Sequence, residues 1–110
     1  MKSFITFGDI VLVPIPWADK DIGVKIRPAV VISRENLLAA GQIIVLGVSS
    51  RKVLNNDEHR IVNWKESGLK LPSKVWLSKP YTATVKTAKK IGTLPPKELL
   101  TIYRQFLSYF

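Results

Sequence analysis

The sequence predicts a mainly β fold, in which a small, strongly bent antiparallel sheet or partly closed barrel is capped by one C-terminal helix. Short apolar runs bounded by proline, glycine and other turn residues recur from residue 8 to residue 94. The stretch from residue 95 to residue 110 instead repeats its apolar side chains at helical spacing. The length of 110 residues suits a single hydrophobic core, so we expect one domain over residues 1–110.

The first two strands are predicted on either side of a polar loop. Residues 8–16, GDIVLVPIP, open on a turn pair and continue as a β-branched run. Residues 17–26 are polar with a central glycine and predict a loop, and residues 27–33, RPAVVIS, predict the second strand. Pro28 is tolerated only at the start of such a strand or on a sheet edge.

The remaining strands differ in their predicted exposure to water. Residues 34–41 permit a short helical turn, and residues 42–50, QIIVLGVSS, are apolar almost throughout, which indicates a strand covered on both faces. Residues 59–64 and 73–79 alternate as half-exposed strands do, and residues 89–94 predict a last short strand.

The C-terminal segment predicts an amphipathic helix of about four turns. Pro95 and Pro96 suit its first turn, and Glu98 complements the positive end of the helix dipole. One apolar stripe is expected to pack against the sheet, and its members are Leu99, Leu100, Tyr103, Phe106, Leu107 and Phe110.

Composition excludes several classes of function. The chain has no cysteine, so disulfides, thiolate catalysis and cysteine-based metal sites are excluded. No apolar run approaches the ~20 residues that cross a bilayer, and the first residues lack the apolar core of a signal peptide. We therefore expect a cytoplasmic protein that does not act on membranes.

The positive charge is concentrated in the second half of the chain. The formal net charge is +9, of which residues 51–110 carry +8, with twelve basic and four acidic side chains. Seven lysines and no acid lie between Glu66 and Glu98. Such a field attracts polyanions, so nucleic acid is the first partner to consider. The alternative is a solvated surface that only keeps the protein soluble.

Arg27, Ser49 and Ser50 are the candidate catalytic residues. Arg27 stands where a loop enters a strand, and both serines close the third strand, so a guanidinium and a hydroxyl can meet the same phosphate. RNA carries its own nucleophile in the 2′-hydroxyl, so its cleavage needs neither a metal nor a cofactor. The alternatives are a salt bridge from Arg27 to Asp19 or Asp21, and simple strand capping by the serines.

Other catalytic groups are few. His59 is the only histidine, which excludes a two-histidine nuclease. Asp57 and Glu58 are adjacent and either hold a magnesium ion or belong to a polar loop. The polar loop is the better interpretation, so no metal site is expected.

Four blocks of sequence, GDIVLV, KIRPAVVIS, IIVLGVSS and GLKLPSKVWL, are followed by the amphipathic helix and together resemble the MazF/PemK toxins of type II toxin-antitoxin pairs. The resemblance covers roughly residues 7–110. It implies an SH3-like barrel of five to seven antiparallel strands that forms a homodimer. It also implies a metal-independent endoribonuclease that cuts single-stranded messenger RNA, leaves a 2′,3′-cyclic phosphate and is blocked by an acidic antitoxin.

The same resemblance implies roles for individual residues. Arg27 matches the family's catalytic arginine, and Ser49 stands where a threonine is usual, with Ser50 as its substitute if the strand register differs by one. The first loop is expected to lie over the RNA, with Trp17 stacking on a base or closing the core. The expected substrate-binding residues are Pro16, Trp17, Lys25, Arg51, Lys52 and Lys79.

The proton acceptor is left open by the sequence. Arginine is effectively always protonated, so it stabilises charge but is a poor proton shuttle. The unperturbed pKa of His59 suits neutral pH, so this side chain is either the acceptor or a structural histidine.

Two other functions compete with the nuclease. A gyrase-poisoning toxin of the CcdB kind shares the fold, but that family ends in a tryptophan-containing tail, whereas this chain ends in FLSYF. A non-catalytic RNA-binding module of SH3-like fold would grip phosphates with the same lysines without cleaving the strand.

Overall fold

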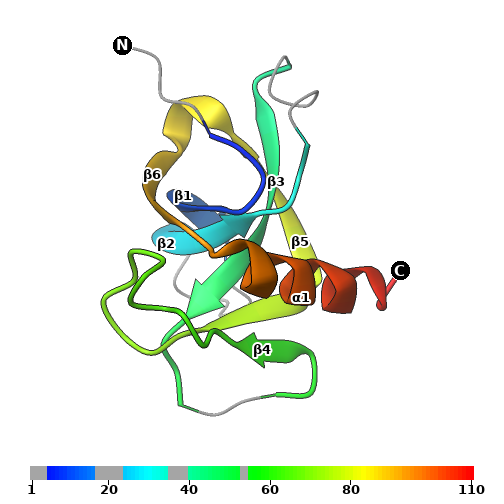
Figure 1. Cartoon of the computed structure of the whole chain (residues 1–110). Coiled ribbons are helices and arrows are strands. Elements are labelled where there is room, and N and C mark those ends of the chain that lie inside the picture. The colour runs from blue at the N-terminus through cyan, green and yellow to red at the C-terminus, as the bar shows by residue number, and fades with distance from the viewer. Residues whose placement is uncertain (1–4, 17–23, 35–39, 53–54) are drawn as a thin grey trace.

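Six antiparallel strands form one sheet, against which a C-terminal helix packs (Figure 1). The computed structural model describes residues 5–16, 24–34, 40–52 and 55–110. The strand order is β4-β5-β3-β2-β1-β6. The elements are β1 (Asp9–Pro16), β2 (Val24–Val31), β3 (Gln42–Ser49), β4 (Glu58–Arg60), β5 (Lys74–Thr84), the 3₁₀ turn η2 (Val85–Thr87), β6 (Lys89–Thr93) and α1 (Pro96–Leu107).

The mainly β fold with a C-terminal helix is confirmed, and the six strands fall within the predicted five to seven. The sheet is not closed, because β4 and β6 are its two edges and no strand pairing joins them in the described part of the chain. The predicted bent sheet or partly closed barrel is therefore an open six-stranded sheet.

Three element boundaries differ from the prediction. β2 begins at Val24, inside the predicted loop, because residues 24–26 pair with residues 14–16 of β1. β4 has only three residues, since the chain leaves the sheet after Arg60 and turns through residues 61–73. β5 extends to Thr84 along β3. The helical turn predicted for residues 34–41 falls mostly on residues 35–39, which lie outside the described residues.

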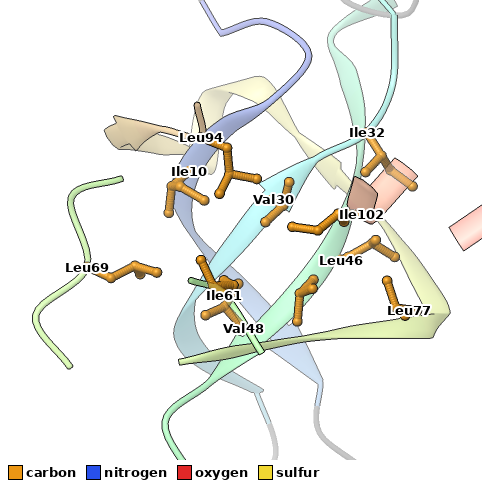
Figure 2. Close-up of a cluster of buried hydrophobic side chains, with 11 residues drawn as sticks. Ile10, Val30, Ile32, Leu46, Val48, Ile61, Leu69, Leu77, Leu94 and Ile102 are labelled. Atoms are coloured by element: carbon orange, nitrogen blue, oxygen red, sulfur yellow. The ribbon is translucent and has the colours of Figure 1, made fainter. Parts of the chain in front are cut away.

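The central strand β3 is covered on both faces, as its apolar sequence predicts. Its side chains alternate between two buried clusters, with Leu46 and Val48 in one and Ile43 and Val45 in the other. Figure 2 shows the first cluster, in which Ile102 of α1 meets side chains from the sheet. Tyr81, Ala83, Val85 and Ala88, from the end of β5 and the turn after it, pack against the second cluster.

Helix α1 is shorter than predicted, and the face that it buries differs slightly from the predicted apolar stripe. It has 12 residues, which is about three turns. Ile102, which the predicted stripe omits, is fully buried, whereas Leu100, Leu107 and Phe110 are exposed. The packed stripe is therefore Leu99, Ile102, Tyr103 and Phe106. No helix among the described residues is long and apolar enough to cross a membrane.

A buried carboxylate fixes the start of β1. Asp9 is 1% exposed and accepts hydrogen bonds from the backbone N–H of Thr6 at 2.8 Å and the hydroxyl of Thr93 at 3.0 Å. Lys90 approaches the same carboxylate at 3.3 Å. Gly8 has a φ of 94°, and a Cβ at this position would overlap Leu99 of the helix. The Gly-Asp pair thus ties β1 to β6 and to α1.

The segment of residues 61–73 lies directly against β6. A Cβ on Gly92 would overlap the carbonyl oxygen of Ser67, and a Cβ on Gly68 would overlap that of Ile91. Only glycine permits this close approach of two backbones. The approach brings residues 68–73 to the edge of the sheet, where they form one wall of the cavity described next.

Candidate active site

A cavity of about 460 Å³ opens where β2 and β3 separate. Its lining includes the end of β3, drawn as an arrowhead in Figure 1, and part of the green loop of residues 61–73. The strand pairing of β2 with β3 ends at Ala29 and Gly47, although both strands continue. The lining residues are Leu12, Arg27, Pro28, Val48, Ser49, Ser50, Gly68, Leu69, Lys70, Leu71, Ser73, Lys89 and Ile91.

All three predicted catalytic residues line this cavity. Ala29 pairs with Gly47, the last pair of β2 with β3, and Arg27 and Ser49 each lie two residues beyond this pair in their own strands. Side chains two residues apart in a strand point to the same face, so Arg27 and Ser49 lie on the face of the Ala29–Gly47 pair. Paired residues on neighbouring strands point to the same face. Ser50 is one residue beyond the end of β3 and is exposed. The register therefore favours Ser49 over Ser50 as the hydroxyl that acts with Arg27.

The hydroxyl of Ser49 is oriented by the backbone. Its Oγ accepts a hydrogen bond from the N–H of Arg51 at 3.2 Å. A hydroxyl that accepts one hydrogen bond can still donate its own proton. Ser49 can thus donate a hydrogen bond to an anion in the cavity.

All charged side chains among the described residues that line the cavity are positive. Arg27, Lys70 and Lys89 contribute three cations, and none of the described residues that line it is acidic. Three serine hydroxyls and several aliphatic side chains make up the remainder. This combination suits an anionic ligand that also has apolar surface, as a nucleotide does.

The predicted substrate-binding residues lie outside the cavity lining. Lys25, in β2, and Arg51 and Lys52, after β3, are exposed. Lys79 lies over the ring of Trp76, 4.8 Å from its centroid. These four residues stay predictions for a longer RNA.

The two remaining residues of the predicted set belong to the first loop. Pro16 ends β1 and pairs with Val24 through its backbone. Its side chain and the whole of Trp17 lie outside the described residues. Base stacking by Trp17 therefore stays a prediction.

The acid-free lysine run is not one uniform surface. Lys74 is 4% exposed and forms an ion pair with Glu58 at 2.8 Å, and Lys90 approaches Asp9. Lys70 and Lys89 instead line the cavity, which sequence reasoning missed. The signal was present, because alternation along residues 89–94 places Lys89 and Lys90 on opposite faces.

Asp57 and Glu58 make structural contacts. Asp57 accepts hydrogen bonds from the hydroxyl of Ser78 at 2.5 Å and from Nε1 of Trp76 at 2.7 Å. These bonds hold the pKa of Asp57 below its ordinary value. Glu58 pairs with Lys74, and no group of three potential metal ligands occurs in the described ranges. Asp57 lies in the turn before β4, as the polar-loop interpretation expects, whereas Glu58 is the first residue of β4 and not part of a loop.

His59 contacts Glu98 rather than the cavity. The distance between His59 Nε2 and a carboxylate oxygen of Glu98 is 3.3 Å. Glu98 is 6% exposed and also accepts the backbone N–H groups of Val62 and Asn63 at 2.6 and 2.8 Å. Burial raises the pKa of Glu98, but the bonds from Asn63, Val62 and His59 outweigh burial and lower it overall. The geometry thus gives His59 a structural contact between β4 and α1.

Several solved structures share the fold over nearly the whole chain. The MazF toxin of Deinococcus radiodurans is 19% identical, with a TM-score of 0.77, over 97% of this chain and 96% of that chain. A MazE-MazF structure from the same organism is 17% identical, with a TM-score of 0.73, over 97% and 95%. An endoribonuclease in complex with its cognate antitoxin, from a mycobacterial species, is 10% identical, with a TM-score of 0.73, over 96% and 94%.

A search of curated protein sequences gave no match. The family described as "PemK-like, MazF-like toxin of type II toxin-antitoxin system" matches residues 6–110. This match extends from just before the Gly-Asp turn to the end of the chain and includes every described residue that lines the cavity. The chain therefore belongs to the PemK-like, MazF-like toxins of type II toxin-antitoxin systems.

Proposed function

We propose that this toxin is an endoribonuclease that cleaves single-stranded RNA without a metal ion. One observation carries the proposal: Arg27 and Ser49 line the same cavity at the point where their strands separate. The family match and the solved relative described as an endoribonuclease support the reaction class. The net charge of +9 supports a polyanionic substrate.

The proposed reaction uses the nucleophile of the substrate. The 2′-oxygen attacks the adjacent phosphorus and passes its proton to water, while the bond from phosphorus to the 5′-oxygen breaks and that oxygen takes a proton from water. The products are a 2′,3′-cyclic phosphate and a 5′-hydroxyl. Negative charge builds up on the non-bridging oxygens in the transition state, and Arg27 stabilises it with a forked pair of hydrogen bonds. Ser49 donates a further hydrogen bond to the same phosphate.

Two partners follow from the proposed function. An acidic antitoxin segment would cover the cations of the cavity and exclude RNA, and two solved relatives are MazE-MazF structures. A second copy of the chain is the other proposed partner, since Leu100, Leu107 and Phe110 leave apolar surface exposed on and beyond α1. The oligomeric state is measured by sedimentation at several concentrations.

The test incubates the purified protein with a mixed-sequence single-stranded RNA in EDTA. We expect discrete fragments that end in a cyclic phosphate, and a loss of at least a hundredfold in cleavage rate for Arg27→Ala. Arg34→Ala is the matched control, because Arg34 is exposed and does not line the cavity. Arg34→Ala should unfold at the wild-type temperature, and circular dichroism should show that Arg27→Ala is folded at the assay temperature.

The other outcomes separate the alternatives. Intact RNA that still shifts on a gel would favour a non-catalytic binding module. Inhibition of DNA gyrase supercoiling, with no cleavage of RNA, would favour a gyrase-poisoning toxin. Cleavage that disappears in EDTA and returns with magnesium would contradict the metal-free reaction.

A further inference from the structure

Two lysines that the proposed mechanism does not use share the cavity with Arg27. Lys70 comes from the segment of residues 61–73, and Lys89 is the first residue of β6. Leu12 of β1 pairs with Lys89 on one side and with Pro28 on the other. All three of these residues line the cavity. The cavity therefore extends across three neighbouring strands, from β6 over β1 to β2.

Lys89 and Arg27 are separated by the width of two strand spacings. Neighbouring strands lie about 4.8 Å apart, and β1 lies between β2 and β6. The backbones that carry these two cations are therefore roughly 10 Å apart. Lys89 pairs with Leu12 of β1 and Arg27 pairs with the next residue, Val13, so alternation directs the two side chains to different faces of the sheet, although both residues line the cavity. They are therefore better placed to bind two successive phosphates of one strand than to share a single phosphate.

Lys90, the neighbour of Lys89 in β6, forms an ion pair within the chain. Its amino group lies 3.3 Å from the buried carboxylate of Asp9. Lys89 is adjacent in sequence, projects to the other face and meets a cavity whose described lining has no acid. Lys70 is also exposed, and it lies in the cavity wall that residues 68–73 form. The two cavity lysines are thus placed to bind an external anion.

The surface between the cations is apolar. Leu12, Leu69 and Ile91 line it, and Leu71 stands at its rim with 57% of its surface exposed. Aliphatic side chains can cover the face of a sugar or base without fixing its identity. A volume of about 460 Å³ lies within the range of pockets that hold a group of nucleotide size.

We propose that Lys70 and Lys89 form a second phosphate-binding position, so that the cavity holds two successive phosphates of single-stranded RNA with one nucleoside over the aliphatic surface between them. The inference rests on the proposed function, because it takes the phosphate at Arg27 as the one that is cleaved. Lys70 and Lys89 hold the strand in register, so that the scissile phosphate meets Arg27 and Ser49.

The first test measures binding at several salt concentrations. The ligand is an RNA oligonucleotide that carries a 2′-deoxy sugar at the mapped cleavage position, so it binds but cannot react. Each phosphate contact contributes about 0.7 to the slope of log K against log[salt] for a single strand. We expect Lys70→Gln and Lys89→Gln each to lower the slope by about that amount and the double variant by about twice that amount. Lys86→Gln, an exposed lysine outside the cavity, should leave it unchanged.

The second test identifies the phosphate. Methylphosphonate groups replace, one at a time, the phosphates on either side of the cleaved one. One of these neutral groups should weaken binding to the wild type by about tenfold and should have little effect on the Lys70→Gln/Lys89→Gln variant, because the same contact has already been removed. Equal losses in both proteins would overturn the proposal.

Two further results are decisive. Slopes for the cavity variants that match that of Lys86→Gln would overturn the second phosphate position even if cleavage is normal. Normal RNA binding with weakened binding of a polyglutamate peptide would also overturn it and would assign the two lysines to an acidic protein partner. A wild type that binds the all-ribose RNA but never cleaves it would contradict the proposed function, and the salt slopes measured on that uncleaved RNA would still report on the lysines.

Discussion

The cavity and the junction between β4 and α1 use charge in opposite ways. At the junction, the buried carboxylate of Glu98 accepts hydrogen bonds from two backbone N–H groups and contacts His59. At the cavity, Arg27, Lys70 and Lys89 lie together, and no acid is present among the described lining residues. Charge that serves the fold is thus matched by partners of opposite polarity within the chain. Charge of one sign that faces an open cavity is instead suited to a ligand.

The largest effect that would test this contrast is expected from Glu98→Gln. The substitution replaces a carboxylate oxygen that accepts an N–H with an amide group that cannot, inside a site that is 6% exposed. We expect a loss of about 3 kcal/mol in the free energy of unfolding. For a chain of this size the midpoint of thermal unfolding should then fall by roughly 10–20 °C, as measured by circular dichroism.

Glu66→Gln is the matched control for that experiment, because Glu66 is exposed and makes the same change of charge. Its unfolding temperature should stay within a few degrees of the wild type. Equal stability of the two variants would show that the junction does not depend on the buried carboxylate, and the contrast with the cavity would fail.

An intermediate effect is expected at the cavity, where Ser49→Ala should impair cleavage and leave the fold intact. Loss of one hydrogen bond to a charged phosphate should lower the cleavage rate by roughly tenfold to a hundredfold. The free energy of unfolding should change by less than about 0.5 kcal/mol, since Ser49 is outside the buried core. Single-turnover kinetics on a defined RNA provide the measurement.

Ser50→Ala is the control for Ser49→Ala, and Ser49→Thr is the conservative variant. Alternation from the Ala29–Gly47 pair places Ser49, and not Ser50, on the same face as Arg27, so Ser50→Ala should cleave RNA at nearly the wild-type rate. Ser49→Thr keeps the hydroxyl and should also stay close to the wild-type rate. A large loss in Ser50→Ala, with little in Ser49→Ala, would show that the strand register shifts by one residue beyond Gly47.

The strands whose sequence is apolar could be predicted well, because burial on both faces determines their composition. Residues 42–50 are the clearest case, since β3 occupies the centre of the sheet between two clusters. The predicted strand over residues 59–64 is longer than β4, because three of residues 61–64 are apolar or aromatic but belong to the segment that turns against β6. Ile61 is buried there, whereas Val62 is 77% exposed. Alternation alone does not distinguish a strand from a turn that covers the core.

Sequence reasoning predicted Arg27 and Ser49 of the candidate site, but not Lys70 and Lys89. Ser49 ends β3 as predicted, whereas Arg27 lies inside β2 rather than at its predicted start, and their proximity follows from the pairing of β2 with β3 two residues away. Lys70 and Lys89 meet only because Gly68 and Gly92 let two backbones approach closely. This contact joins segments that are more than twenty residues apart, and no local pattern reports it. The lysine run predicted the positive charge of this part of the chain, but not that Lys74 and Lys90 form ion pairs with Glu58 and Asp9.

The smallest expected effect concerns acid, and it tests the structural side of the contrast. The pKa values of Asp57 and Glu98 are both lowered in the folded protein. Above the pKa values of the unfolded chain both groups are ionised in either state, and their contribution to stability is complete. As the pH falls below those values, the unfolded chain takes up protons first, so stability decreases until the folded carboxylates are protonated as well.

The wild type should therefore lose stability as the pH falls below the ordinary carboxylate range, near 4.5 for glutamate. Asp57→Asn should reduce this dependence slightly, because the contacts of Asp57 are only partly shielded from water. Urea unfolding at a series of pH values measures the slope. Lys89→Gln should leave the slope at its wild-type value, since Lys89 faces a cavity without acidic lining residues in the described chain. A change in slope for Lys89→Gln would place an acidic group within its reach and would remove the distinction between the two regions.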